Sequence, residues 1–456
     1  MSTIFSIKKN KLLRVAWQCA FIVMLFLYVY NPQFTFLSGG VTKFVILLVL
    51  PFVYIWRIEL LRIMLRKEIL FFVGGAFFLY LYSLEVTYLT GAFDSTFAPF
   101  FREIYLISIP LSLALTYLFA RKVECSFDGF LRLFMTVITI QALFIMADRL
   151  IPAFREFIPT LVVNNALPDR VLDFRSSGIS SGTGDGLSFI QAVGVMIAYY
   201  LLITSRVTFL SNLVYGLSFL LCFLSILFTG RTGLFLTVVF VATFIVVNHH
   251  SFATLGRTLK YLLLAFFIAI PLYFVTIPEN TRSFLETTVF SWSFEFIGNY
   301  VDTGTFSTSS SDEVKEMLVL PGNEKELLFG SGYFDNYMTV EEAKYGQPMV
   351  IARYMNSDPG YVRTIFYSGI IGLVLILSYY LYVAFCSAKN AIERQKLAFM
   401  VSFWVMMFVA HFKVSFLYYG TSTRIMFLFY FILLLEVICR VDSDNKIVSN
   451  YLTLKT

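Results

Sequence analysis

The most restrictive feature of this sequence is a series of apolar runs that recurs along its whole length. Each run is about 18 to 22 residues long, which is enough for a helix to cross a hydrocarbon core of about 30 Å. Hydrophobic residues make up 58% of the chain and charged residues 14%, whereas soluble domains average roughly 25% charged residues. The sequence therefore predicts an all-α polytopic membrane protein.

The apolar runs predict about twelve transmembrane helices. They form a single integral membrane domain, residues 1–456, in which no internal repeat and no separate soluble domain is found. The expected helices cover residues 12–30, 42–56, 69–90, 104–120, 130–148, 187–204, 209–228, 233–248, 260–277, 361–385, 397–417 and 424–439.

Lysines and arginines are concentrated in alternate loops. These residues are enriched in short cytoplasmic loops of membrane proteins. The opposite short loops, 31–41 and 91–103, contain only Arg102. Both termini are therefore expected in the cytoplasm, and the first apolar run is too long for a cleaved signal peptide. The basic residues that set this orientation are Lys8, Lys9, Lys11, Arg14, Arg57, Arg62, Arg66, Lys67, Arg121, Lys122, Arg206, Arg257, Lys260, Lys389, Arg394, Lys396, Arg440 and Lys446.

Two longer loops are expected on the outer side, at residues 149–186 and 278–360. The first ends in a run rich in Gly, Ser and Thr, and the second carries five basic and thirteen acidic residues, a net charge of −8. Long translocated loops carry such charge freely. The overall net charge of +6 therefore reflects membrane orientation and indicates no nucleic-acid partner.

Cysteine placement predicts no disulfide framework. None of the five cysteines falls in an expected outer loop, and disulfides persist mainly in oxidising compartments. The five are Cys19, Cys125, Cys222, Cys386 and Cys439.

Two arginines on the outer side are candidate anion-binding residues. Arg231 lies in the short turn 228–233, where flanking glycines let a ligand approach the backbone. Its planar guanidinium matches phosphate oxygens; the alternative is an interfacial arginine whose head reaches water. Arg175 precedes the Gly/Ser/Thr-rich run just before a helix, where backbone N–H groups favour an anion. The alternative for Arg175 is a place in a flexible connector.

Asp358 is the carboxylate of most interest, because it stands with Pro359-Gly360 immediately before the tenth expected helix. At that junction it would face the group that Arg175 and Arg231 bind, or it would act as a helix N-cap. Other charged groups near helix ends have structural explanations: two local pairs, Arg102 with Glu103 and Asp148 with Arg149, and a buried network for His411 and Lys413.

Several chemistries are absent from the sequence. It has no nucleotide-binding glycine-rich loop and no Cys/His cluster, and its only Asp-x-Asp motif, 442–444, lies in the expected cytoplasmic tail. The first outer loop, 31–42, has no acidic residue, unlike metal-dependent lipid-linked oligosaccharide transferases. We therefore expect no metal and no cofactor.

Four motifs in chain order resemble the bacterial O-antigen polymerase (Wzy) and O-antigen ligase superfamily, over residues 170–375. Two of them contain the candidate arginines, and the others lie within and after the large loop. The motifs are Arg175-Ser176-Ser177-Gly178, Thr229-Gly230-Arg231-Thr232-Gly233, Leu328-Phe329-Gly330-Ser331-Gly332, and Asp358-Pro359-Gly360-Tyr361 followed by Gly369-Ile370-Ile371-Gly372.

The resemblance implies a GT-C-like inner-membrane glycosyltransferase with a large periplasmic loop between helices 9 and 10. Its donor would be an oligosaccharide linked to undecaprenyl pyrophosphate, and its partners a polysaccharide co-polymerase, a flippase and membrane lipid. Arg231 and Arg175 would neutralise the pyrophosphate, Asp358 would be the general base, and Arg363 would contact the donor phosphate or the acceptor. The motifs add Gly178, Gly330, Gly332 and Tyr361 as substrate-binding positions.

Two departures from the family pattern favour a polymerase over a ligase. Asp358 stands where the ligases have His, and the Pro-Asn that follows Arg-x-x-Gly in the family is missing. The alternatives are an O-antigen ligase, which attaches finished glycans to lipid A–core, and a flippase or transporter for lipid-linked oligosaccharides.

Overall fold

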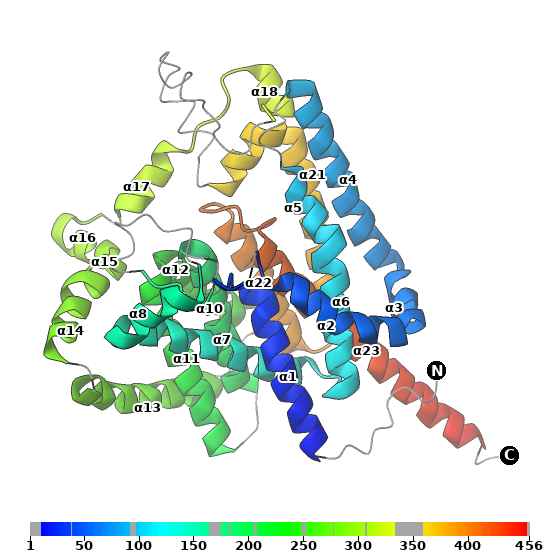
Figure 1. Ribbon diagram of the computed structural model, residues 1–456, viewed down its shortest axis with the longest axis horizontal. Helices are drawn as coiled ribbons and strands as arrows, with labels where there is room; N and C mark the ends of the chain where they lie inside the picture. The colour runs from blue at the N-terminus through cyan, green and yellow to red at the C-terminus, as the bar shows by residue number, and fades with distance from the viewer. Residues whose placement is uncertain are drawn as a thin grey trace.

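The computed structural model describes residues 11–37, 39–91, 97–163, 175–180, 182, 184–204, 208–248, 252–276, 278–305, 308–332 and 359–453. Over these ranges the chain is helical, apart from loops and one isolated β-bridge between Phe34 and Val162. Figure 1 shows the helices gathered into one bundle. They are α1 (Lys11–Tyr30), α2 (Thr42–Ile55), α3 (Arg57–Met64), α4 (Lys67–Thr90), α5 (Ala98–Glu103), η1 (Ile104–Ser108), α6 (Ile109–Lys122), α7 (Phe127–Leu150), α8 (Pro152–Leu161), α10 (Gly184–Thr204), α11 (Phe209–Thr229), α12 (Arg231–Asn248), α13 (Phe252–Thr276), α14 (Glu279–Phe284), η2 (Leu285–Phe290), α15 (Ser291–Ser293), α16 (Glu295–Thr303), α17 (Ser309–Glu316), α18 (Glu324–Phe329), α21 (Gly360–Asn390), α22 (Arg394–Ala410) and α23 (Gly420–Thr453).

Eight of the described helices are long and apolar enough to cross a membrane, which confirms a polytopic helical membrane protein. The bent pair α2 and α3 would make a ninth, with 97° between its two helices. The expected count of about twelve is therefore not confirmed. The expected helix 42–56 agrees with α2 to within one residue. The helix ends there because the next turn contains Arg57, Glu59 and Arg62, and charged groups are costly in hydrocarbon. Helix α3, which follows the bend, was not expected.

Helix α10 is the centre of the bundle. Of its most apolar window, 94% is buried inside the protein, and it packs against α7, α11 and α12 (Figure 1). Near its C-terminal end the Tyr200 ring contacts Phe399 of α22 at 5.2 Å and Phe244 of α12 at 6.2 Å. A helix that is apolar on all sides is expected to be enclosed in this way.

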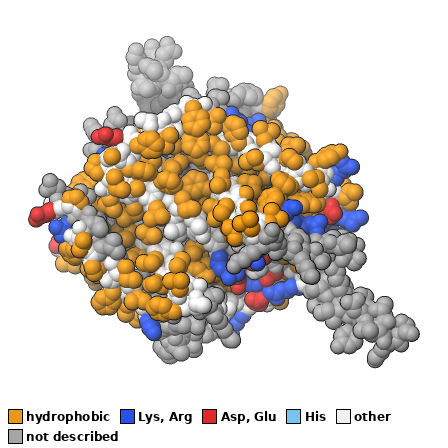
Figure 2. Space-filling model, turned by 60° about the horizontal axis from the view of Figure 1, so that its bottom comes forward, with side chains coloured by type: hydrophobic (Ala, Val, Ile, Leu, Met, Phe, Trp, Pro, Cys, Tyr) orange, Lys and Arg blue, Asp and Glu red, His pale blue; other side chains and the backbone are white. Residues whose placement is uncertain are grey.

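The surface of the bundle is rich in exposed hydrophobic side chains. Figure 2 shows one face covered largely by them, with most charged side chains gathered toward its edges. Exposed examples include Leu47 on α2, Phe78 on α4 and Val238 on α12. Such a surface suits contact with lipid, whose hydrocarbon core is as apolar as these side chains.

Helix α18 packs closely on α21 at a kink in α21. Gly369 there has φ +69° and ψ −179°, and it interrupts the helical backbone. The Ser331 N–H donates to the Phe366 carbonyl at 2.8 Å, and the Gly332 N–H donates to the Tyr367 carbonyl at 3.0 Å. The third motif, 328–332, and the Gly369–Gly372 part of the fourth therefore meet.

The expectation of no disulfide is wrong in this structure. A disulfide joins Cys125, in the short segment before α7, to Cys439 of α23. The two cysteines are 314 residues apart in the sequence, so spacing along the chain carries no signal of the pairing. The other three cysteines are free.

Candidate functional site

A backbone hydrogen bond joins the first motif to the residue immediately before the second motif. The N–H of Ser176, beside Arg175, donates to the carbonyl of Phe228 at the end of α11, at 2.8 Å. Ser176 Oγ also donates to Asp148 Oδ2 of α7 at 2.5 Å. These bonds hold the segment 175–180 against the turn that contains Arg231.

The turn between α11 and α12 packs on the N-terminal end of α10. A Cβ atom at Gly233 would fall 2.6 Å from the Ser188 carbonyl oxygen, and one at Gly230 would fall 3.4 Å from the Gly184 carbonyl oxygen. Only glycine at position 233 lets α12 approach α10 this closely. The glycines that flank Arg231 therefore fix its position beside α10.

Arg175 and Arg231 converge on the ring of Trp292, from α15 in the large loop. Their guanidinium carbons lie 5.2 Å and 4.5 Å from the ring centroid, respectively. Arg231 Nη1 also donates to the Trp292 carbonyl at 3.3 Å. Two of the three residues predicted to meet around the donor are thus brought together. The third, Asp358, lies outside the described residues.

Among the described residues, the charged side chains around these arginines include one more cation than carboxylates. Arg231 forms an ion pair with Glu295 of α16, and Thr232 Oγ1 donates to Asp185 of α10. Lys413 Nζ lies 3.9 Å from Asp185 Oδ1. Three cationic side chains thus share two carboxylates. We call these residues, together with Trp292, the arginine site.

The electrostatics of the arginine site favour an anion. Burial lowers the pKa of Arg175, the carboxylate of Asp185 opposes that shift, and the charge of Arg231 adds to it. The Arg231 side chain is only 12% exposed. Partly buried guanidinium groups held close together repel each other, and an anionic group between them would relieve that repulsion.

Gly178 has a structural explanation at its place in the site. Its φ is +53°, and a Cβ atom there would fall 2.8 Å from Gln141 Nε2. The same Gln141 amide donates to the Ser177 carbonyl at 2.8 Å. Gly178 thus lets the segment after Arg175 lie against α7.

Tyr361 lies at the start of α21 and packs against the segment after α22. Its hydroxyl donates to the Phe408 carbonyl at 2.9 Å, and its ring lies 4.6 Å from that of His411. His411 is buried, as expected, and Lys413, two residues on, reaches Asp185. The segment after α22 thus connects the start of α21 to the arginine site. Arg363 is half-buried in the first turn of α21 and acts electrostatically on Tyr418.

Gly330 and Gly332 lie at the α18–α21 contact, and no contact in the described residues joins them to the arginines. A Cβ atom at Gly330 would fall 2.1 Å from the Tyr367 carbonyl oxygen. Close packing therefore accounts for Gly330, while the substrate-binding role of both glycines stays a prediction.

The two predicted local charge pairs have different outcomes. Arg149 Nε lies 3.6 Å from Asp148 Oδ2, which confirms that pair. Glu103 instead pairs with Arg424 of α23, at 2.5 Å. Arg424 also donates to the Tyr28 carbonyl at 2.8 Å. The prediction that pairs Glu103 with Arg102 is wrong, because the buried Arg424 needs a counter-charge more than an exposed arginine does.

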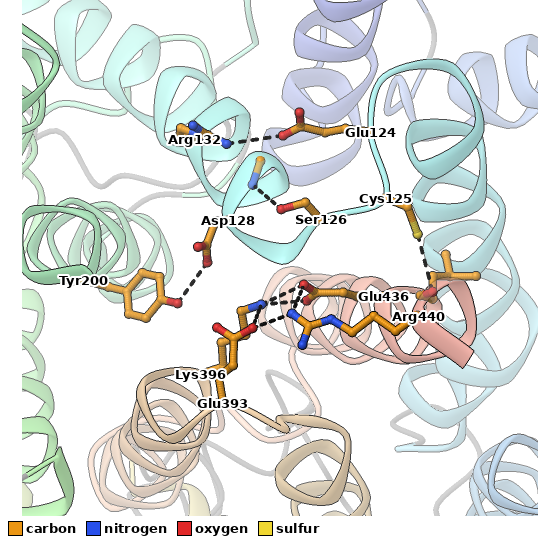
Figure 3. A network of polar contacts seen from close by, with 12 residues as sticks. Glu124, Cys125, Ser126, Asp128, Arg132, Tyr200, Glu393, Lys396, Glu436 and Arg440 are labelled. Atoms are coloured by element: carbon orange, nitrogen blue, oxygen red, sulfur yellow. Dashed lines mark hydrogen bonds and ion pairs between the residues drawn. The ribbon is translucent and has the colours of Figure 1, made fainter. Parts of the chain in front are cut away.

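A second charged cluster lies at the opposite end of α10 (Figure 3). Lys396 Nζ contacts both Glu436 oxygens, at 2.7 and 2.9 Å, and Glu393 at 3.3 Å. Arg440 pairs with Glu436 at 2.9 Å and also with Glu393. We call these four residues the lysine network. Every member forms an ion pair with another member, so a structural role accounts for the lysine network.

The two charged clusters are separated by most of the length of α10. Tyr200, which donates to Asp128 beside the lysine network at 2.9 Å, lies fifteen residues after Asp185. At 1.5 Å per residue the distance along the helix is about 22 Å. The arginine site and the lysine network are therefore independent of each other.

In comparisons with known proteins, no protein-family model and no curated protein matches the chain. In the described residues, no group of three or more His, Cys, Asp or Glu side chains is placed to hold a metal ion.

Trp292, Glu295 and Asp185 are the site residues that sequence reasoning missed. Trp292 is one of only four tryptophans. Its place in a polar loop, near Glu295, was the one sequence signal that could have indicated a site residue. Asp185 stands within the Gly/Ser/Thr-rich run, at the first turn of α10. Asp185 is placed where a carboxylate stabilises a helix, so its position alone did not single it out.

Proposed function

We propose that the protein is a metal-independent glycosyltransferase, an O-antigen polymerase. It would transfer a growing glycan, with inversion, from undecaprenyl pyrophosphate to a lipid-linked repeat unit. The observation that carries this proposal is the convergence of Arg175 and Arg231 on Trp292. Both belong to motifs that resemble the family, and the partly buried cations suit a pyrophosphate.

In this proposal the arginine site holds the leaving group. Negative charge builds up on the pyrophosphate as the glycosidic bond breaks, and preorganised cations stabilise that charge. Arg231 and Arg175 supply two of these cations, and Lys413 adds a third positive charge at the rim of the site. Arg231 forms an ion pair with Glu295 in this structure, so the donor phosphate would replace the Glu295 carboxylate as its partner.

The remaining roles follow from the predicted topology. Asp358 would deprotonate the acceptor hydroxyl, and the acidic loop 278–360 would bind sugars and close over them. Arg363 and Tyr361, at the start of α21, would orient the acceptor. Both termini would lie in the cytoplasm of a bacterium, with the site on the periplasmic face of the inner membrane and a co-polymerase setting chain length.

The test is to replace Arg231 with Ala or Lys in a strain whose surface polysaccharide depends on this protein. The glycan ladder is read on a gel and membrane abundance by immunoblot. Long chains should be lost from both variants, because Lys lacks the planar fork of Arg. Arg394→Ala, which removes an exposed cation at the start of α22, is the matched control and should keep the full ladder. Long chains at normal abundance of Arg231→Ala would refute the proposal.

The same gel separates the polymerase from the ligase alternative. Loss of a polymerase leaves a single repeat unit on the lipid A–core, while loss of a ligase leaves the core unmodified. A flippase is separated by the location of the undecaprenyl-linked repeat, which would accumulate on the cytoplasmic face. The missing internal repeat argues against a transporter.

A further inference from the structure

A cavity of about 260 Å³ lies between α2 and α3 on one side and η1 and α6 on the other, away from both charged clusters. Every residue that lines it is apolar. The cavity is partly open to the surface of the bundle and offers water few polar partners, so apolar groups suit it. Its walls include Val49 and Val53 of α2, Leu60 and Met64 of α3, Ile107 of η1 and Ala114 of α6.

Two irregularities of the backbone form this cavity. The 97° bend between α2 and α3 makes the two helices adjacent walls of one space. At the bend, the Trp56 ring contacts Tyr117 of α6 at 5.7 Å and faces the Arg121 guanidinium at 5.7 Å, which anchors α3 to the end of α6. The π-helical turn η1 forms the opposite wall, and π-helical turns occur frequently at functional sites.

Helix α3 combines an apolar wall of the cavity with exposed cations. At about 3.6 residues per turn, Arg57 shares the helix face of Leu60 and Met64, whereas Arg62 and Arg66 lie on the other face. Leu60 and Met64, one turn apart, line the cavity. The cationic side chains in α3, and those just after its end, are exposed. None of these cations forms an ion pair with a carboxylate in the described part of the chain. They are Arg57, Arg62, Arg66 and Lys67.

We propose that this cavity binds one hydrocarbon chain of an anionic membrane phospholipid, whose phosphate lies against the cations of α3. An apolar cavity beside a basic amphipathic helix matches both parts of such a lipid. A neutral lipid would fill the cavity but bring no anion to the four cations, which outnumber the two carboxylates of the same stretch, Glu59 and Glu68. A helix of a second copy is about 10 Å wide, so it would cover the cavity without entering it.

The test uses the purified full-length protein in detergent and counts retained lipids by native mass spectrometry. Phosphatidylglycerol and phosphatidylcholine with identical acyl chains are added in equal amounts. The wild-type protein should retain the anionic lipid preferentially. In the variant R57Q/R62Q/R66Q that preference should fall by about fivefold for each arginine removed. Lys389→Gln with Arg394→Gln, two exposed cations elsewhere on the chain, should leave it unchanged.

A second pair of variants tests the cavity itself. Ala114→Phe fills it and should reduce the retention of both lipids about tenfold, whereas Ala20→Phe, at an exposed alanine of α1, should change neither. If Ala114→Phe does not elute as the wild type on size exclusion, Ile107→Phe replaces it. Equal retention of the two lipids by the wild type, or an unchanged preference in the arginine variant, would overturn the proposal. So would unchanged retention in the filled-cavity variant.

Discussion

Gly369 lies directly against the carbonyl group of Leu328, and a Cβ atom there would fall 2.1 Å from the carbonyl oxygen. On the other side of the same contact, Gly330 has φ +83° and lies equally close to the carbonyl oxygen of Tyr367. Two backbones thus touch without any side chain between them. This contact holds the large loop to α21, near the end of the bundle where α21 begins.

Gly369→Ala should destabilise the protein strongly. The added methyl group meets backbone atoms, which cannot move aside, and φ +69° is itself strained for alanine. We expect a loss of about 3 kcal/mol or more, measured by thermal unfolding in detergent. Gly304→Ala is the control, because Gly304 has φ +73° and no atom near its Cβ position. It should lose only about 1 kcal/mol; equal losses would refute the role of the contact.

Lys396→Ala should also destabilise the protein, by about 3 kcal/mol, because it leaves the buried carboxylate of Glu436 with one partner fewer. Lys396→Met combined with Glu436→Leu should cost much less, since no charge is then left unpaired. The control is Lys315→Ala, whose ion pair with Asp312 is exposed and contributes at most about 1 kcal/mol. Thermal unfolding of the three variants decides the matter. A double variant as unstable as Lys396→Ala would contradict this account.

The stability of the protein should fall at mildly acidic pH through His411. Burial lowers the pKa of His411 to about 3, from 6.5. Below pH 6.5 the unfolded chain binds a proton that the folded protein does not. Stability is therefore unaffected by this group above that pH, and falls by up to about 1.4 kcal/mol per unit as the pH drops toward 3.

His411→Gln removes this titration. Between pH 7.5 and 5 the melting temperature of the variant should fall less than that of the wild-type protein. Groups other than His411 contribute equally to both proteins, so the difference between the two slopes isolates this imidazole. Parallel slopes would show that His411 is protonated in the folded protein.

The disulfide between Cys125 and Cys439 provides a test of the predicted orientation. The basic loops predict that this end of the bundle lies in the reducing cytoplasm, where disulfides are rare. Acid-quenched cells, alkylated after denaturation, should therefore give five modified cysteines by mass spectrometry. Purified protein oxidised in air should give three, at Cys19, Cys222 and Cys386. Three from cells would place this end outside the cytoplasm.

Sequence reasoning was most successful where the physics is local. Arg175 and Arg231 were selected because a cation in an apolar sequence needs a reason, and the structure brings them to one ring. The membrane class follows from run length alone. By contrast, Trp292 comes from a loop helix whose position depends on packing, and no periodicity in the sequence indicates its partners.

Partners that are distant in the sequence explain the other differences. Glu103 and Arg424 are 321 residues apart, and the neighbouring Arg102 was the only partner that spacing could suggest. The end of α2 was predicted correctly, because the apolar run 42–56 stops where the charged turn of α3 begins. Helix α3 was missed, because its charged residues read as a loop between two spans.

The enclosure of α10 has a consequence for how the chain is assembled during synthesis. The helices that surround α10 include α7, made before it, and α11 and α12, made after it, while α22 packs on α12. The ribosome therefore completes α10 before α11 and α12 exist, so part of its surface has no protein neighbour at that stage. A chain stopped before Arg394 would leave α12 without α22 and the central packing incomplete. The central packing is thus completed only late in the synthesis of the chain.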